Sequence, residues 1–314
     1  MQNILKNTSA DDNTVAPWIL LLMISGYVVA ALFAFTLFSQ LLIGVLFGYG
    51  LQEIVTLFSN PSATEDARLP LMLMQGVTSL GAFVLAPILF IKFHLKLPLK
   101  PFFEIPKQAT RPVFMTIVVL FCFMVANSIV IEWNQNINIP EFLSWFEEWA
   151  QSKELQLEEL TEYLTSFTGI HEYLIAMLVI AVLPAVGEEL LFRGLIQNLF
   201  QKATGNHHVA IWVAAILFGV MHFQFYGVVP RIFLGALFGY LYYWSGHLSL
   251  AMIGHFINNG LTLTLLYFTQ LELTDFDPTS MENSPPFYVV SIFFVAGAVL
   301  LYLFRNYFSQ MKNA

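Results

Sequence analysis

Long runs of apolar residues recur from Trp18 to Phe304, and short polar or proline-containing stretches separate them. An α-helix rises about 1.5 Å per residue, so about 20 apolar residues cross the roughly 30 Å hydrocarbon core of a bilayer. Eight runs come near this length, and each is predicted to be a membrane-spanning helix. The predicted spans are 18–48, 70–93, 112–132, 172–200, 208–226, 229–245, 248–269 and 286–305.

One stretch outside these spans follows a different pattern. Residues 141–168 place aromatic residues and leucines among glutamates, directly after Pro140. This pattern predicts an amphipathic helix on the outer interface of the membrane. Its acidic polar face gives no attraction to anionic lipid, so we interpret it as a structural belt. Gating of a substrate is the alternative.

The composition favours a single membrane domain. The chain is 57% hydrophobic and 11% charged, whereas soluble domains have about 45–50% and about 25%. Residues 1–314 are therefore predicted to form one all-α domain, a polytopic transmembrane helical bundle in a lipid bilayer. Cys122 is the only cysteine, which excludes an intrachain disulfide and a cysteine metal site. The net charge of −8 disfavours a nucleic-acid partner.

Lysine and arginine near the span ends predict the orientation, because cytoplasmic loops carry an excess of both. With an even number of spans, most of these residues fall on one side, and the other side receives Arg68, Lys153 and most acids. Both termini are therefore predicted to be cytoplasmic, and we expect a bacterial inner membrane. The basic side carries Lys6, Lys92, Lys96, Lys100, Lys107, Arg111, Lys202, Arg305 and Lys312.

Three charged residues lie within the fourth predicted span: Glu188, Glu189 and Arg193. Each costs about 2.5–3.5 kcal/mol on insertion scales, so such residues face the bundle interior and usually mark function. Glu189 and Arg193 are spaced i,i+4 and can neutralise each other. Glu188 points about 100° away around the helix and is a candidate general base. The alternative is an ion-pair clasp between helices that includes Glu188.

Further polar residues interrupt two later spans. His222 follows Gly219, which lets another helix approach the imidazole closely. His255 and Asn259 are spaced i,i+4, so both project from one helix face and could form an oxyanion hole. The alternatives are a packing histidine for His222 and interhelical hydrogen bonding for His255 and Asn259.

The helical rise allows a comparison of depths in the membrane. From the predicted cytoplasmic ends, Glu188 lies about 18 Å deep and His222 about 21 Å deep. His255 lies roughly 10–12 Å deep and Asn259 about 17 Å deep. These depths predict that the four residues share one layer and line a common cavity.

Three motifs on successive predicted helices resemble the CPBP intramembrane peptidases, also called the abortive-infection or type II CAAX-endopeptidase family. The stretch from Gly235 through Gly239 to His255 is similar to the family's run between its last two motifs. The resemblance covers about residues 172–265, which we interpret as the catalytic core. The motifs are Glu188-Glu189-x-x-x-Arg193, Phe218-x-x-x-His222 and His255-x-x-x-Asn259.

The resemblance implies an endopeptidase, a hydrolase that cuts a membrane protein or peptide near a membrane face. Eukaryotic relatives remove the last three residues of prenylated CAAX proteins. The implied roles are activation of water by Glu188 with His222, stabilisation of the oxyanion by His255 and Asn259, and ordering of the site by Glu189 and Arg193.

Metal dependence stays open at this point. Glu188, His222 and His255 could bind a catalytic zinc ion with an open fourth position. Asn259 is a poor zinc ligand and a good oxyanion donor, which favours a reaction that requires no cofactor. A zinc-dependent peptidase is the alternative.

Other classes of function fit the sequence less well. A noncatalytic membrane scaffold, or an immunity or regulatory protein with the same fold, would not need four polar residues in one layer. A proton-coupled transporter would have paired discontinuous helices, which the sequence does not indicate. Arg231 follows Pro230 and is expected to extend to the outer interface, with pairing to the site as the alternative.

Overall fold

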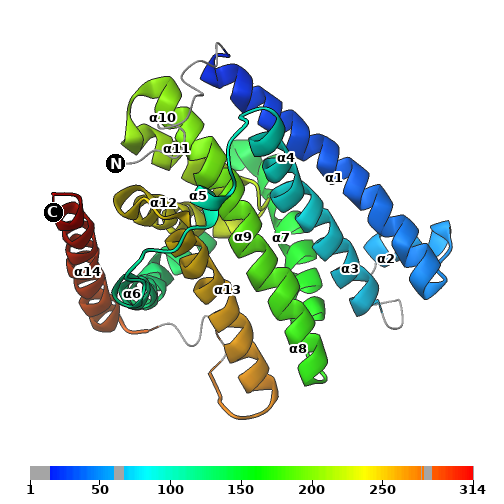
Figure 1. Ribbon diagram of the computed structural model, residues 1–314. Coiled ribbons are helices and arrows are strands. Elements are labelled where there is room, and N and C mark those ends of the chain that lie inside the picture. The colour runs from blue at the N-terminus through cyan, green and yellow to red at the C-terminus, as the bar shows by residue number, and fades with distance from the viewer. Residues whose placement is uncertain (1–14, 60–66, 277, 279–284, 314) are drawn as a thin grey trace.

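The structure is a computed structural model that describes residues 15–59, 67–276, 278 and 285–313. These residues form helices and no strands, which confirms the predicted all-α bundle (Figure 1). The α-helices are α1 (Pro17–Phe47), α2 (Leu51–Ser59), α3 (Arg68–Ser79), α4 (Ala86–Phe93), α5 (Lys100–Phe103), α6 (Thr110–Gln135), α7 (Ser144–Thr165), α8 (Ile170–Ala176), α9 (Leu183–Glu189), α10 (Asn198–Thr204), α11 (His207–Val220), α12 (Val228–Ser245), α13 (Leu248–Gln270) and α14 (Phe287–Asn313).

Six helical segments in the described ranges are long and apolar enough to cross a membrane. The chain is therefore an integral, multi-pass membrane protein. The predicted seventh span is the 23-residue helix α13, which is long enough but less apolar because it carries His255, Asn258 and Asn259. The six segments are Pro17–Phe47, Arg68–Phe93, Thr110–Gln135, Ile170–Thr204, Phe225–Ser245 and Phe287–Met311.

The predicted fifth span, 208–226, is too long. Helix α11 has 14 residues and ends at Val220, so it rises about 21 Å, less than the hydrocarbon core. Phe223 has a φ of 54°, in the left-handed region, where a helix cannot continue. His222 therefore lies in the turn after α11 and not inside a span.

π-helical turns interrupt two long helical segments, Arg68–Phe93 and Ile170–Thr204, and the second carries the acidic motif. The turns η3 (Leu80–Leu85) and η5 (Met177–Val182) end two residues before Pro87 and Pro184. Proline donates no backbone hydrogen bond and its ring crowds the preceding turn, which the wider π-helical turn relieves. A third π-helical turn, η6 (Leu190–Gln197), follows α9. Glu188 and Glu189 thus lie between two π-helical turns, a feature frequent at functional sites.

Close packing at glycines brings the central helices together. A Cβ added to Gly187 in α9 would lie 2.9 Å from Phe83 Cβ in η3. A Cβ added to Gly219 in α11 would lie 2.6 Å from a side-chain atom of Ile232 in α12. The absence of side chains at both glycines therefore allows α9 to pack on η3 and the end of α11 to pack on the start of α12. The largest apolar cluster draws on α1, α4, α6, η6, α12, α13 and α14.

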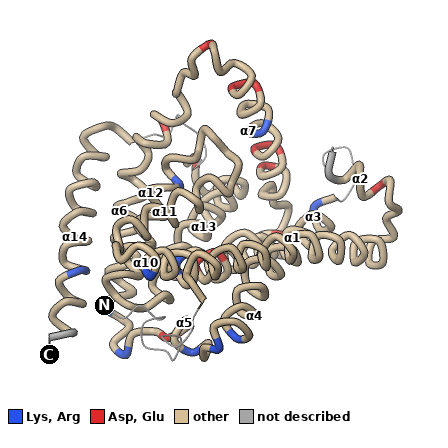
Figure 2. Tube along the Cα trace, turned by 90° about the horizontal axis from the view of Figure 1, so that it is seen from above, with Lys and Arg blue, Asp and Glu red and all other residues tan. Residues whose placement is uncertain are grey.

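The predicted amphipathic segment forms the short 3-10 turn η4 (Glu141–Leu143) and helix α7. Helix α7 carries six of the 21 acidic residues, at the opposite end of the molecule from the basic residues around α4 and α5 (Figure 2). The end of α7 is held by Arg68 in α3, whose Nη2 donates to Ser166 Oγ and whose Nη1 pairs with Glu172 Oε2 at 2.7 Å. Helix α7 is therefore docked on the bundle and contacts α3, α8 and η7 (Phe225–Gly227).

Candidate active site

Glu189 is the centre of a buried network that joins three helical segments. Its side chain and that of Arg193 are fully buried. Glu189 Oε1 accepts hydrogen bonds from Arg193 Nη1 at 2.7 Å and from His255 Nδ1 at 2.9 Å. The predicted i,i+4 pair is thus confirmed, and it extends from α9 and η6 to α13.

Arg193 is enclosed by aromatic rings and by backbone. Its Cζ lies 4.5 Å from the ring centroid of Phe218 and 5.5 Å from that of Phe238. Its Nη2 donates to the Gly235 carbonyl at 2.8 Å. A Cβ on Gly235 would lie 3.0 Å from that same Nη2, so glycine provides the space for the guanidinium. This explains the glycine at the start of the Gly235-x-x-x-Gly239 pattern.

His255 and Asn259 lie together on α13, as their i,i+4 spacing predicts. The His255 ring stacks on Phe238, with 5.2 Å between centroids and 17° between the ring planes. Asn259 Nδ2 donates to the Ile180 carbonyl at 3.0 Å and lies 3.4 Å from His255 Nε2. Since Nδ1 of His255 donates to the Glu189 carboxylate, Nε2 of a neutral ring is the acceptor. In this arrangement both donors of Asn259 are directed at protein atoms.

The ring of His222, in the turn after α11, is held by a hydrogen bond to the last part of that helix. Its Nδ1 lies 2.8 Å from the Phe218 carbonyl, which can only accept, so Nδ1 carries the proton. Nε2 of the neutral ring is then free to accept a hydrogen bond. Across residues 67–276, no hydrogen bond or ion pair joins His222 to Glu188. The sequence predicted that these two residues act as a pair; in the structure no direct hydrogen bond joins them, and the pairing stays a prediction.

Glu188 has a buried carboxylate oxygen without a partner. The residue is 8% exposed, and among the described residues nothing hydrogen-bonds to Oε2. Glu188 interacts electrostatically with His255, Glu189, Arg193 and Arg231. Glu189 Oε2 is also buried without a partner, but of the two carboxylates only that of Glu188 lines the cavity described next.

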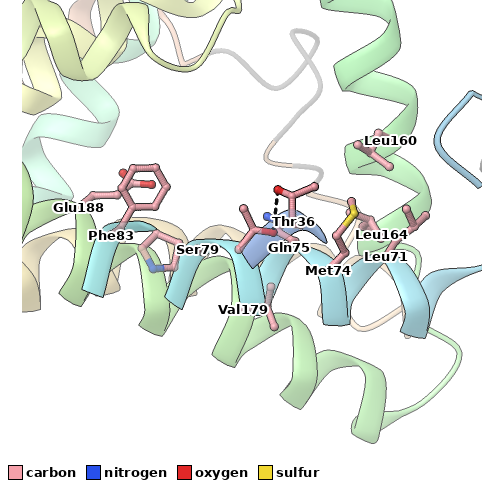
Figure 3. Close-up of a pocket in the computed structure, with 12 residues that line it drawn as sticks. Thr36, Leu71, Met74, Gln75, Ser79, Phe83, Leu160, Leu164, Val179 and Glu188 are labelled. Carbon is pink, nitrogen blue, oxygen red and sulfur yellow. Dashed lines mark hydrogen bonds between the residues drawn. The ribbon is translucent and has the colours of Figure 1, made fainter. Parts of the chain in front are cut away.

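A cavity of about 350 Å³ ends at Glu188. Figure 3 shows Glu188 and Phe83 at one end of this cavity and Leu160 and Leu164 of α7 at the other. Helix α7 therefore forms part of the wall of the space that leads to the carboxylate. The remaining lining residues are Thr36, Leu71, Met74, Gln75, Thr78, Ser79, Val179 and Pro184.

Arg231 lies nearer to the site than the sequence indicated. It was expected to extend to the membrane interface, but its Nη1 is buried. Its Nη2 donates to Gln224 Oε1, and Gln224 Nε2 donates to Glu154 Oε1 of α7 at 3.3 Å. The guanidinium also interacts electrostatically with Glu188 and His222. Sequence reasoning missed Gln224 and Glu154 because no spacing rule joins them to Arg231.

The donor set does not fit a metal ion. In the part of the chain that the structure describes, no three His, Cys, Asp or Glu side chains are grouped to hold a metal. His255 Nδ1 is committed to Glu189 and His222 Nδ1 to the Phe218 carbonyl. Glu188, His222 and His255, the zinc ligands considered from the sequence, do not come together as a ligand group.

Comparison with known proteins finds a family model to which the same segment is similar. Residues 170–261 match the family model described as type II CAAX prenyl endopeptidase Rce1-like. This segment is Rce1-like. The resemblance seen in the motifs is thereby confirmed for the segment, which contains every residue of the buried network.

Part of the chain is also similar to a curated protein. The uncharacterized protein YpbD of Bacillus subtilis (strain 168) is 30% identical to this chain over 82 residues. The match covers 25% of this chain and 39% of the length of YpbD. No solved structure matches the chain.

Proposed function

We propose that this chain is an intramembrane endopeptidase that hydrolyses a peptide bond with water activated by Glu188. The observation that carries the proposal is the unpaired, buried Oε2 of Glu188 at the end of a cavity. A buried carboxylate oxygen without a partner is costly unless a water or a substrate group occupies the site. The Rce1-like match of the surrounding segment supports the choice of reaction.

In the proposed reaction, Glu188 removes a proton from a water molecule while the water oxygen attacks the carbonyl carbon of the scissile bond. The electron pair of the C=O bond moves to its oxygen, which becomes an oxyanion. Nε2 of His222 accepts the second hydrogen bond of the water and orients it. When the intermediate collapses, the C–N bond breaks and Glu188 returns the proton to the leaving amine.

Glu189 and Arg193 act as an ordering pair in this proposal, and His255 with Asn259 stabilises the oxyanion. The Glu189 carboxylate, 2.9 Å from Nδ1, orients the His255 ring for this role. Asn259 could turn one N–H from Nε2 to the substrate, because their 3.4 Å contact is long for a hydrogen bond. No step of this scheme passes through a metal ion.

The proposed substrate is a membrane protein or peptide. The cavity beside Glu188 has a largely apolar lining, from α3, α7 and η5, which suits apolar side chains of a substrate segment. We also propose a bacterial inner membrane with both termini in the cytoplasm. The separation of the basic α4 and α5 region from the acidic α7 supports this orientation (Figure 2).

The direct test uses purified full-length protein reconstituted in liposomes and a panel of membrane peptides. Wild type is expected to cleave at least one peptide, and mass spectrometry of the products gives the site of cleavage. Glu188→Gln keeps the shape of the side chain but cannot take the proton, so cleavage should fall by about 10²–10⁴-fold.

The matched control is Glu158→Gln on α7, an exposed glutamate outside the cavity. It should cleave as wild type does. If Glu188→Gln cleaves the same peptide at the wild-type rate, the catalytic assignment is wrong. If wild type cleaves no peptide of the panel, a noncatalytic scaffold or regulatory protein replaces the peptidase proposal.

A further inference from the structure

Arg231 presents a buried donor that has no partner. Among the described residues, the buried donor nitrogens without a hydrogen bond include Nη1 of Arg231 and Nε of Arg193. Arg193 is enclosed by aromatic rings and paired with Glu189. Arg231 makes no ion pair in the described chain. Burying a cationic donor without a hydrogen-bond partner costs free energy. This cost indicates that another group accepts a hydrogen bond from Nη1.

The chain holds this guanidinium in place from three sides. Nη2 donates to Gln224 Oε1, and Gln224 in turn donates to Glu154. Glu154 Oε2 also accepts from the backbone N–H of Tyr226 at 3.2 Å, so helix α7 fixes the turn that carries Gln224. A Cβ on Gly227 would collide with Nη1. Gly227 has a φ of −124°, which any residue can adopt, so the glycine here supplies space for the guanidinium.

Packing of α11 on α12 places Arg231 near the reacting groups. A Cβ on Gly219 would lie 3.0 Å from the Val228 carbonyl and 2.6 Å from an Ile232 side-chain atom. The end of α11, where His222 lies, therefore presses against the first turn of α12, which contains Arg231. In agreement, Arg231 interacts electrostatically with both His222 and Glu188.

His255 and Asn259, which the sequence predicted as oxyanion donors, already have hydrogen-bond partners within the protein. Asn259 Nδ2 donates to the Ile180 carbonyl and faces His255 Nε2. His255 Nδ1 donates to Glu189. As the residues stand, the N–H groups of both side chains face protein atoms, whereas Nη1 of Arg231 has no partner among the described residues. A donor that needs no rearrangement contributes most to stabilising charge that appears only in the transition state.

We propose that Arg231 is a further catalytic residue, whose Nη1 donates a hydrogen bond, in addition to those proposed for His255 and Asn259, to the oxyanion formed when water attacks the scissile carbonyl. This inference rests on the proposed peptidase function. The bond that forms is C–O from the water, the proton goes to Glu188, and the carbonyl electron pair moves to the oxygen that Arg231 stabilises. Glu154, Gln224 and Gly227 are positioning residues for the guanidinium.

The test compares kcat and KM for a peptide that wild type cleaves. Arg231→Gln should lower kcat by about 10²–10³-fold with little change in KM, because the interaction exists only in the transition state. Gly227→Ala keeps the positive charge but displaces Nη1, so it should also lower kcat. The matched control is Arg111→Gln, whose guanidinium stacks on Tyr307 with Cζ 4.8 Å from the ring centroid. It should leave both constants unchanged.

The possible results separate the two proposals. If wild type cleaves a peptide and both Arg231→Gln and a folded Gly227→Ala retain wild-type kcat, the role of Arg231 is refuted while the peptidase function stands. A raised KM with unchanged kcat likewise overturns it, because Arg231 would then bind only the ground state. Absence of cleavage by wild type refutes the peptidase function, and with it this role. Circular dichroism and thermal unfolding establish that each variant is folded, and Gly227→Ala provides the result if Arg231→Gln does not fold.

Discussion

His255 Nδ1 donates to Glu189 Oε1 across 2.9 Å, and this one contact ties α13 to α9 in the buried centre of the bundle. The same oxygen accepts from Arg193 Nη1. A single carboxylate oxygen therefore serves a histidine and an arginine. Glu189 therefore joins Arg193 and His255, and Glu188 beside it has an unpaired oxygen and lines the cavity.

The first prediction concerns the stability of this network. Glu189→Gln removes the negative charge that compensates the fully buried Arg193. Breaking a buried pair by removing one partner costs about 3–5 kcal/mol, because an uncompensated charge remains. Unfolding of the purified protein, followed by circular dichroism in detergent, should show a loss of this size.

The control for this prediction is a double-mutant cycle. Arg193→Met alone should also destabilise the protein, and the double variant should lose less than the sum of the two single losses. Additive losses would show that the two residues do not interact energetically, against the 2.7 Å contact.

The second prediction concerns the glycine beside Arg193. In Gly235→Ala the new Cβ would lie 3.0 Å from Arg193 Nη2 and 3.2 Å from Ala215 Cα. Overpacking of this kind costs about 1–3 kcal/mol, and we expect the thermal midpoint and the activity to fall together. Gly26→Ala in α1 is the matched control, since no atom lies within 4 Å of its added Cβ. Equal behaviour of the two variants would contradict the close packing at Gly235.

The third prediction concerns the cavity. Met74 lines the cavity from α3, and Met74→Trp should fill part of its approximately 350 Å³. The cleavage rate for peptides with large side chains should drop, while the thermal midpoint is kept or raised because a void is filled. Met311→Trp, at an exposed position of α14, is the control. Unchanged cleavage by a folded Met74→Trp protein would remove the cavity from the substrate path.

The fourth prediction concerns metal dependence. Glu188, His222 and His255 are not grouped as ligands in the described chain, so we expect cleavage to persist after exhaustive chelation. Metal analysis of the same sample must accompany the activity measurement. Loss of cleavage on chelation, restored by zinc alone, would establish the zinc-dependent alternative.

Local periodicity determined a large part of this protein. The lengths of the apolar runs predicted the helices, and the i,i+4 spacing predicted the Glu189–Arg193 pair and the adjacency of His255 and Asn259. These predictions succeed because helix geometry alone decides which neighbours on one helix share a face. The amphipathic pattern before residue 168 likewise predicted helix α7.

Only the tertiary structure decided which helices meet and at what rotation. It joined His255 to Glu189, left His222 without a direct hydrogen bond to Glu188 among the described residues, and brought Glu154 of α7 to Gln224 beside Arg231. It also ended α11 at Val220, where the turn before α12 begins. The physical reason is that partners far apart in the chain are selected by side-chain packing between helices, which helical periodicity does not encode.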